Sequence, residues 1–488
     1  MRRSGLLLHI SSLPSPGGIG TLGKAAYDFV DFLKASGTAI WQMLPVNPTS
    51  YGDSPYQSFS TFAGNPYFID LPMLEKDGLL ERDEYLPLVR EDAAVDYEHL
   101  YRTRPVILHR AFSRGGNALQ ADIDAFSQQN PWLDDYALFL ALKDHFNGLP
   151  WTEWDEDIRL RKPEAVSAWH AQLCEEIRYH MFVQFLFFRQ WEALRDYANR
   201  QGILLMGDLP IYVALDSSDV WTSPDAFLLG EDKRPVEVAG VPPDYFSELG
   251  QLWGNPLYDW DAMEKDGFSW WIARLGATAK LFDMVRLDHF IGFANYYAIP
   301  ASSPDARIGE WRIGPGFALF EKIHQKLPQL TIIAEDLGVV SPRVQALLKK
   351  TGFPGMKVLD FAFGSDMDNW NLPHNLKQNC VLYTGTHDND PILGWWEGAG
   401  EEERAFTLEY LGLDDDSTLC DAMIRAAFLS VADTVIIPMQ DYLELGREAR
   451  MNCPGTLGGN WQWRMQDGAA NQALAGRILS LNESSDRI

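Results

Sequence analysis

Three acidic residues, each at the end of a hydrophobic run, are the side chains of this chain best placed to do chemistry: Asp288, Glu335 and Asp388. Each run is typical of a buried parallel strand that meets charge at its C-terminal end. In an α/β barrel, catalytic groups gather at that end of the strands. Three carboxylates at one rim could break and remake a glycosidic bond. Two would do the covalent work, and the third would support the cationic transition state.

The neighbours of the first two carboxylates suggest different tasks for them. Arg286 lies two residues before Asp288, so strand alternation puts both side chains on one side. A guanidinium there favours the ionised carboxylate that a nucleophile needs, although a structural ion pair at a strand end is the alternative. Glu335 is followed by Asp336. Neighbouring carboxylates and partial burial would raise its pKa as a general acid requires, although an acidic pair at a helix start is the alternative.

The third carboxylate follows a histidine, which leaves two interpretations open. A metal site made of His387, Asp388 and Asp390 is conceivable, but the spacing defines neither a calcium loop nor a zinc cluster. His387 as a donor to a sugar hydroxyl is the more economical hypothesis. Asp208, at the end of the preceding hydrophobic residues 204–207, completes a ring of polar groups at strand ends.

Alternating strands and helices predict a (β/α)8 barrel, of the TIM-barrel class, as the frame for these residues. The eight candidate strands are residues 6–10, 39–46, 203–213, 284–290, 330–337, 356–363, 380–388 and 434–440. An amphipathic helix is expected at residues 24–36, where it stops at Gly37, and a long, aromatic-rich helix at residues 175–200, which stops at Gly202. Ser341 and Pro342 predict a capped helix start, and Gly352 predicts its end.

Two long connections interrupt this alternation. Residues 48–173, between the second and third strands, are far more than one helix needs and predict an inserted subdomain. Residues 214–267, between the third and fourth strands, are rich in Pro, Gly and Asp and predict an insertion or lid over the barrel mouth. We expect both insertions to be largely helical, within a single catalytic domain over residues 1–488.

Composition excludes several other classes of protein. A formal net charge of −27 argues against nucleic acid and anionic membrane surfaces, which need clustered Lys and Arg. Four cysteines without a C-x-x-C pair argue for reduced thiols in a cytoplasmic protein rather than a zinc site. The first apolar run, residues 6–10, is too short for a signal peptide. Residues 18–23 match G-x-G-x-x-G, but prolines separate them from the strand and the acidic residue of a dinucleotide site is missing.

Taken together, the motifs resemble those of the 4-α-glucanotransferases, also called amylomaltases or disproportionating enzymes, of the α-amylase superfamily. The resemblance runs nearly end to end. It is carried by residues 285–289, 334–338 and 384–390, and also by 52–58, 64–67, 207–210, 250–256, 454–456 and 460–464.

The resemblance implies a role for each matching residue. Asp288 would be the nucleophile, Glu335 the acid/base and Asp388 the transition-state stabiliser, with no cofactor and no metal. Arg286 would orient Asp288, and Asp208, Asp336 and His387 would bind hydroxyls of the donor sugar. Ser54 and Tyr56 would reach the site from the loop after the second strand, and Phe361 would contact the sugar chain. Gln251 and Trp253 would lie in a mobile lid beside the acceptor.

We therefore expect a retaining transfer of an α-1,4-glucan segment from a donor to the 4-hydroxyl of an acceptor, through an ester on Asp288. Maltooligosaccharides, amylose or other α-1,4-glucans would be substrates, with glucose as an acceptor, and nucleic acid and membranes would not be partners. The alternatives are a hydrolase with the same carboxylates and a catalytically silent glucan-binding protein.

Overall fold

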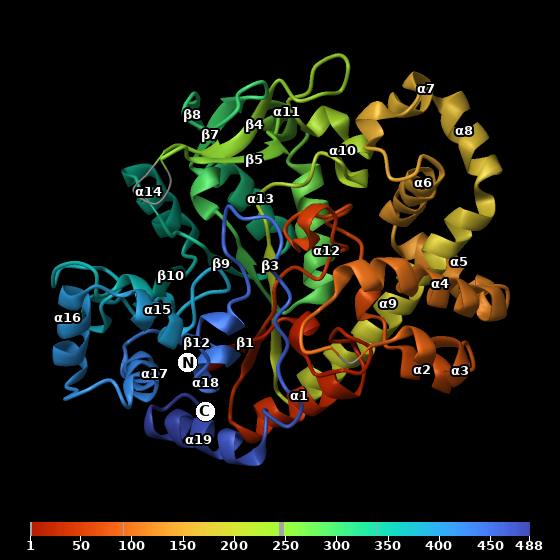
Figure 1. Ribbon diagram of the computed structural model, residues 1–488. Helices are drawn as coiled ribbons and strands as arrows, with labels where there is room; N and C mark the ends of the chain where they lie inside the picture. The colour runs from red at the N-terminus through yellow and green to blue at the C-terminus, as the bar shows by residue number, and fades with distance from the viewer. Residues whose placement is uncertain (1, 91, 244–247, 339) are drawn as a thin grey trace.

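A closed barrel of eight parallel strands forms the centre of the molecule (Figure 1). The computed structural model describes residues 2–90, 92–243, 248–338 and 340–488. The barrel confirms the predicted fold, and each of its strands overlaps a predicted segment. Its strands are β1 (Arg3–Leu7), β2 (Ile40–Gln42), β3 (Leu204–Leu209), β6 (Met284–Leu287), β9 (Thr331–Ala334), β10 (Gly355–Val358), β11 (Cys380–Tyr383) and β12 (Thr434–Pro438).

Helices cover the outside of the barrel, and their ends follow the predicted caps. The side chain of Ser341 accepts a hydrogen bond from Val344 N, and Gly352 ends that helix with a left-handed φ of 73°. The helices that alternate with the strands are α1 (Lys24–Ala35), α9 (Cys174–Arg200), α12 (Ser269–Leu281), α13 (Phe317–Lys326), α14 (Pro342–Thr351), α15 (Ile392–Gly398), α16 (Glu401–Leu411), α17 (Leu419–Leu429), α18 (Met439–Tyr442) and α19 (Gln472–Ser484).

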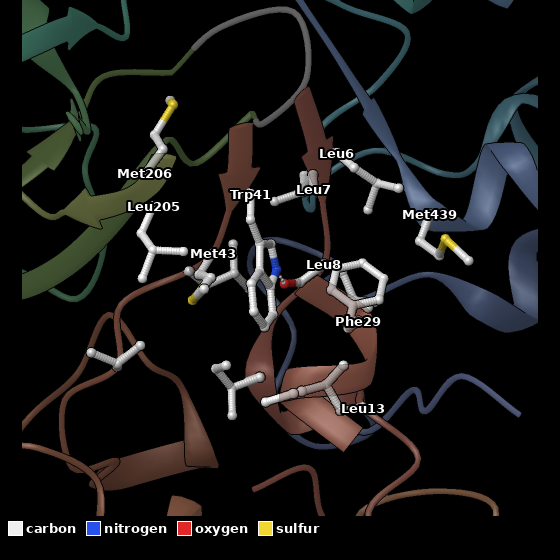
Figure 2. Close-up of a cluster of buried hydrophobic side chains, with 14 of the residues drawn as sticks. Leu6, Leu7, Leu8, Leu13, Phe29, Trp41, Met43, Leu205, Met206 and Met439 are labelled. Atoms are coloured by element: carbon white, nitrogen blue, oxygen red, sulfur yellow. Dashed lines mark hydrogen bonds between the residues drawn. The ribbon is translucent and has the colours of Figure 1, made fainter. Parts of the chain in front are cut away.

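The packing of α1 on the barrel shows how the hydrophobic strands are held in place (Figure 2). The Trp41 side chain of β2 is fully buried, and its ring meets Phe29 of α1 edge-on at 4.9 Å. Its indole N–H donates to Leu8 O over 2.8 Å, so the buried polar atom is satisfied. These contacts hold β2 against α1 and against the residue that follows β1.

The first insertion is helical, as predicted. It lies on the right of Figure 1, against α9. Its helices are α2 (Leu71–Lys76), α3 (Arg82–Tyr85), α4 (Tyr97–Gly115), α5 (Gln120–Gln129), α6 (Trp132–His145), α7 (Glu156–Arg159) and α8 (Pro163–Gln172).

The second insertion is not largely helical, which corrects the expectation. It has two short helices, α10 (Ser218–Thr222) and α11 (Trp260–Lys265), and two strands, β4 (Glu237–Val241) and β5 (Gln251–Pro256). These strands join β7 (Asn295–Pro300) and β8 (Glu310–Ile313), which follow the fourth barrel strand, in an antiparallel sheet of order β5-β4-β7-β8. The sheet lies at the top of Figure 1, beyond one end of the barrel. Each half is an antiparallel pair of consecutive strands, but the segments that join β4 to β5 and β7 to β8 are longer than the two-residue turn that marks a hairpin in a sequence.

The glycines of residues 18–23 serve packing. A Cβ on Gly20 would lie 1.6 Å from Ile10 O, and one on Gly23 would lie 1.9 Å from Asp70 Oδ2. The side chain of Asp70 accepts instead from Thr21 Oγ1 and Met73 N. These contacts explain the motif without a nucleotide. No helix in the described part of the chain is long and apolar enough to cross a membrane.

Candidate active site

A line of charged side chains crosses the C-terminal ends of β3 and β6. Asp208 lies opposite Arg286 in the ladder between these strands, so both side chains stand at one level of the barrel. Arg286 Nη1 is 2.8 and 2.7 Å from the two carboxylate oxygens of Asp208 and 3.0 Å from Asp288 Oδ1. The alternation that predicted Arg286 and Asp288 on one side of the strand is confirmed.

Burial separates the two partners of Arg286. The side chain of Asp208 is fully buried, whereas that of Asp288 is 29% exposed. Although burial lowers it, the charges of Asp208 and Asp288 hold the pKa of Arg286 well above its usual range. The guanidinium therefore stays charged, and it holds Asp288 with one oxygen bound and its carboxylate open to the barrel mouth.

Glu335 follows β9 and is held against the backbone after β6. Its Oε2 accepts from His289 N and its Oε1 from Leu337 N, both over 2.7 Å. Burial, opposed by Arg286 and helped by the charge of Asp288, raises the pKa of Glu335 to about 8. The raised pKa expected of a general acid is present, and burial is its main cause.

Asp388 and His387 lie at the end of β11 on the opposite side of the mouth. Asp388 Oδ1 accepts from Asn452 Nδ2 over 2.6 Å and lies 3.4 Å from His387 Nε2. The same His387 nitrogen is 2.9 Å from the hydroxyl of Tyr56, which donates to Asp208 Oδ2 over 2.8 Å. Because the Tyr56 proton goes to Asp208, Nε2 of His387 carries the proton and donates to Tyr56.

Tyr56 thus connects the two sides of the mouth. Its ring stacks on His387 with centroids 5.2 Å apart and meets Trp461 at 5.7 Å. Ser54 Oγ accepts from Tyr56 N over 3.2 Å and fixes the turn that presents the tyrosine. Ser54 and Tyr56 both come from the loop after β2, as predicted.

Trp253 and Gln251, which were expected in a mobile lid, lie on strand β5 of the antiparallel sheet. The indole N–H of Trp253 donates to Gln251 Oε1 over 3.1 Å. The Trp253 ring meets His289 edge-on at 4.9 Å and Tyr212 at 6.2 Å. His289 directly follows Asp288, so the structure brings this partly exposed tryptophan to the edge of the carboxylate cluster.

Two of the predicted residues lie apart from this cluster. Asp336 Oδ1 accepts from Met356 N over 2.7 Å, and Oδ2 lies 3.6 Å from Lys357 Nζ. Its carboxylate therefore faces β10, and the expectation that it binds donor-sugar hydroxyls has no support in its contacts. Phe361, in the short 3-10 helix Leu359–Phe361, is 43% exposed. Asp336 and Phe361 both line a hollow on the surface beside the carboxylate cluster.

The alternative of a metal site made of His387, Asp388 and Asp390 has no support in the contacts of Asp390. Asp390 pairs with Arg447 at 3.2 Å and with Arg450 at 3.0 Å. Among the residues that the structure describes, no three His, Cys, Asp or Glu side chains group so that they could hold a metal ion.

Three contacts of the site were not predicted. Asn452 holds Asp388, Trp461 packs on Tyr56 and His387, and His289 supplies a backbone donor to Glu335. His289 and Trp461 both have a left-handed φ, 50° and 64°. This conformation is costly for non-glycine residues and gathers at functional sites, but the sequence carries no signal of it.

Carboxylates in contrasting environments, at the mouth of an eight-stranded α/β barrel, characterise enzymes that cleave glycosidic bonds by nucleophilic and acid/base catalysis. A family model described as 4-alpha-glucanotransferase matches residues 8–470. The chain is 48% identical to the 4-alpha-glucanotransferase of Thermus thermophilus, over 100% of this chain and 99% of that one. It is 47% identical to that of Clostridium butyricum, over 97% and 98%.

A solved structure agrees with these relatives. The amylomaltase from Streptococcus agalactiae, in complex with acarbose, matches with a TM-score of 0.97 and 41% identity over 100% of both chains. The chain therefore belongs to the 4-alpha-glucanotransferase family. It is a transferase that moves a segment of an α-1,4-glucan with retention of configuration, through a covalent glycosyl–enzyme intermediate.

Proposed function

We propose that Asp288 is the nucleophile of this transfer, Glu335 its acid/base and Asp388 the stabiliser of the cationic transition state. The contrast between the first two carboxylates carries the proposal. Asp288 is partly exposed and bound to a charged arginine, whereas Glu335 is buried with a pKa of about 8. One carboxylate is thus suited to attack as an anion and the other to carry a proton at neutral pH.

Each half of the reaction then uses both groups. Asp288 attacks the anomeric carbon while Glu335 protonates the leaving oxygen, which gives a glycosyl ester and a shortened glucan. The ionised Glu335 next removes the proton from the 4-hydroxyl of the acceptor, which attacks the ester and restores both side chains. Asp388, whose side chain is 43% exposed beside His387, would stabilise the positive charge that the sugar develops in the transition state.

The polar groups around the trio would hold the donor sugar. Tyr56 and His387 present a hydroxyl and a ring nitrogen beside Asp388. Asp208 is fully engaged by Arg286 and Tyr56, which supports a role in positioning those two groups. Gln251 and Trp253 would border the acceptor, and β5 would act as a lid that excludes water.

The substrates we propose are maltooligosaccharides, amylose and other α-1,4-glucans, with glucose as one acceptor. The bound acarbose of the Streptococcus agalactiae relative supports an α-glucan ligand. We also propose that residues 1–488 form one catalytic domain and that the protein is cytoplasmic. The second proposal rests on Cys174, Cys380, Cys420 and Cys453, none of which forms a disulfide.

Incubation with maltotriose tests transfer against the hydrolase alternative. Transfer produces glucose together with maltodextrins longer than maltotriose, whereas hydrolysis produces only glucose and maltose. A protein that binds maltotriose without converting it would support the silent binding protein. The Asp288→Asn variant is the control, because its amide cannot form the ester.

A further inference from the structure

A hollow of about 510 Å³ lies next to the carboxylate cluster, and apart from the expected contact of Phe361 with the sugar chain it has no part in the reaction as described so far. Asp336, Leu337 and Lys357 line one side of it, and the loop of residues 366–371 lines the other. Its volume falls in the range of about 300–1,000 Å³ typical of small-molecule sites. The hollow adjoins the site through Leu337, a lining residue whose backbone N–H is one of the two donors that hold Glu335.

Two aromatic side chains stand at the hollow with much of their surface in water. Trp370 is 57% exposed and Phe361 is 43% exposed. An exposed aromatic side chain alone needs no explanation, but two that line one hollow form an apolar surface of the kind that binding sites use.

The loop that carries Trp370 is held by its own amide side chains. Asn369 Nδ2 donates to Phe361 O over 2.7 Å and to Ser365 Oγ over 2.9 Å. Asn371 Oδ1 accepts from Val358 N of β10 over 3.1 Å, and the next residue, Leu372, is fully buried. The loop is thus anchored on both sides of Trp370, so the backbone that carries this side chain is held in place.

Polar groups complete the hollow. Asp336 and Lys357, an ion pair with little exposed surface, belong to its lining, as do Asp366, Asp368 and Asn371. An apolar ring face surrounded by hydrogen-bonding groups matches a sugar ring, whose C–H face is apolar and whose rim is hydroxylated. The surplus of carboxylates over the single lysine disfavours a phosphate or another anion.

We propose that this hollow binds the inner sugar rings of the acceptor glucan, with Trp370 as the platform on which one ring stacks. The inference rests on the proposed role of Glu335 as acid/base. That group acts on the oxygen of the acceptor or leaving sugar, so the acceptor lies on the Glu335 side of the reacting carbon. The hollow begins at the two residues that follow Glu335. A single glucose does not reach it, whereas the later rings of a longer acceptor do, so Trp370 sets a preference for long acceptors.

The experiment compares two acceptors with one donor. α-Maltosyl fluoride is the donor, because fluoride leaves no competing glucan, and glucose or maltotetraose is the acceptor. Initial rates of the transfer products give the ratio of kcat/KM for maltotetraose to that for glucose. Trp370→Ala should lower this ratio about tenfold, the factor that corresponds to ~1.4 kcal/mol. Trp311→Ala is the matched control, because Trp311 is 53% exposed on β8 of the antiparallel sheet, and its ratio should stay at the wild-type value.

The outcomes separate this inference from the function on which it rests. A ratio unchanged by Trp370→Ala, or an equal fall of both rates, overturns the acceptor role of the hollow while transfer itself stands. A wild-type protein that releases fluoride but makes no transfer product with either acceptor overturns the transfer mechanism, and the inference falls with it. A lower ratio in Trp370→Ala alone supports the inference.

Discussion

Replacement of Glu335 by glutamine should inactivate the protein and, at the same time, make its stability depend differently on pH. Burial raises the pKa of Glu335 from 4.5 to about 8. Between these values the folded state holds a proton that the unfolded state has released, so rising pH destabilises the wild-type fold. Below pH 4.5 the effect is absent, and above pH 8 it is complete. The Glu335→Gln variant lacks this titration.

The expected magnitude follows from the two pKa values. Each unit of pKa shift corresponds to about 1.4 kcal/mol. Between pH 5 and pH 8, the free energy of unfolding of Glu335→Gln should therefore rise by about 3–4 kcal/mol relative to wild type. The variant also places an amide N–H against His289 N or Leu337 N, the donors that the carboxylate satisfied. That mismatch lowers the free energy of unfolding of the variant by about 1–3 kcal/mol at every pH. It therefore offsets the stability difference between variant and wild type by a constant amount and leaves the pH dependence of that difference unchanged.

Urea unfolding of both proteins at several pH values measures this slope. Glu321→Gln, on the exposed face of α13, is the control and should follow wild type throughout. Transfer activity of Glu335→Gln should fall roughly 10²–10⁴-fold. A stability difference that stays constant from pH 5 to pH 8 would show that Glu335 holds no buried proton, and the reasoning for a general acid would be refuted.

Three further perturbations test other parts of the site. Tyr56→Phe removes a hydroxyl bonded to Asp208 and His387 and should lower kcat/KM by about 10–150-fold, the equivalent of ~1.5–3 kcal/mol, whereas Tyr197→Phe, whose hydroxyl binds a carboxylate on the outer surface, should leave it unchanged. Trp253→Ala should raise the ratio of hydrolysis to transfer with little change in melting temperature, whereas the fully buried Trp271→Ala should cost about 3–5 kcal/mol; a large loss of stability with a constant ratio would make Trp253 a core residue. EDTA should leave activity unchanged, and a loss restored by calcium or zinc would contradict the metal-free mechanism.

The sequence predicted the barrel and the main carboxylates because their signals are local. A hydrophobic run that ends in charge marks the C-terminal end of a buried strand, and this pattern located Asp288, Glu335 and Asp388. The position of Asp336 was open to the same reasoning. Adjacent residues at a strand end point to opposite faces, so a Glu335 that faces the mouth turns Asp336 away from it, and Met356 N of β10 donates to the Asp336 carboxylate there.

Other features depend on contacts that no short pattern carries. Asn452 reaches Asp388 from a loop 64 residues later in the chain. The antiparallel sheet joins strands from two connections, and Trp311 and Ile313 of its edge strand β8 are exposed, so they carry no buried pattern. Strand β5 contains Gly254 and Pro256, residues that are rare in strands, so its sequence carries no clear strand pattern. Only the closure of the barrel brings these segments together.

Trapping of the glycosyl intermediate tests the central claim most directly. α-Maltosyl fluoride can react with Glu335→Gln because fluoride leaves without a proton, but glutamine cannot activate an acceptor, so the ester should accumulate. Mass spectrometry of the digested protein should find a maltosyl group on Asp288. A maltosyl group on Asp388 instead, or fluoride release with a sugar of inverted configuration and no labelled peptide, would contradict the account.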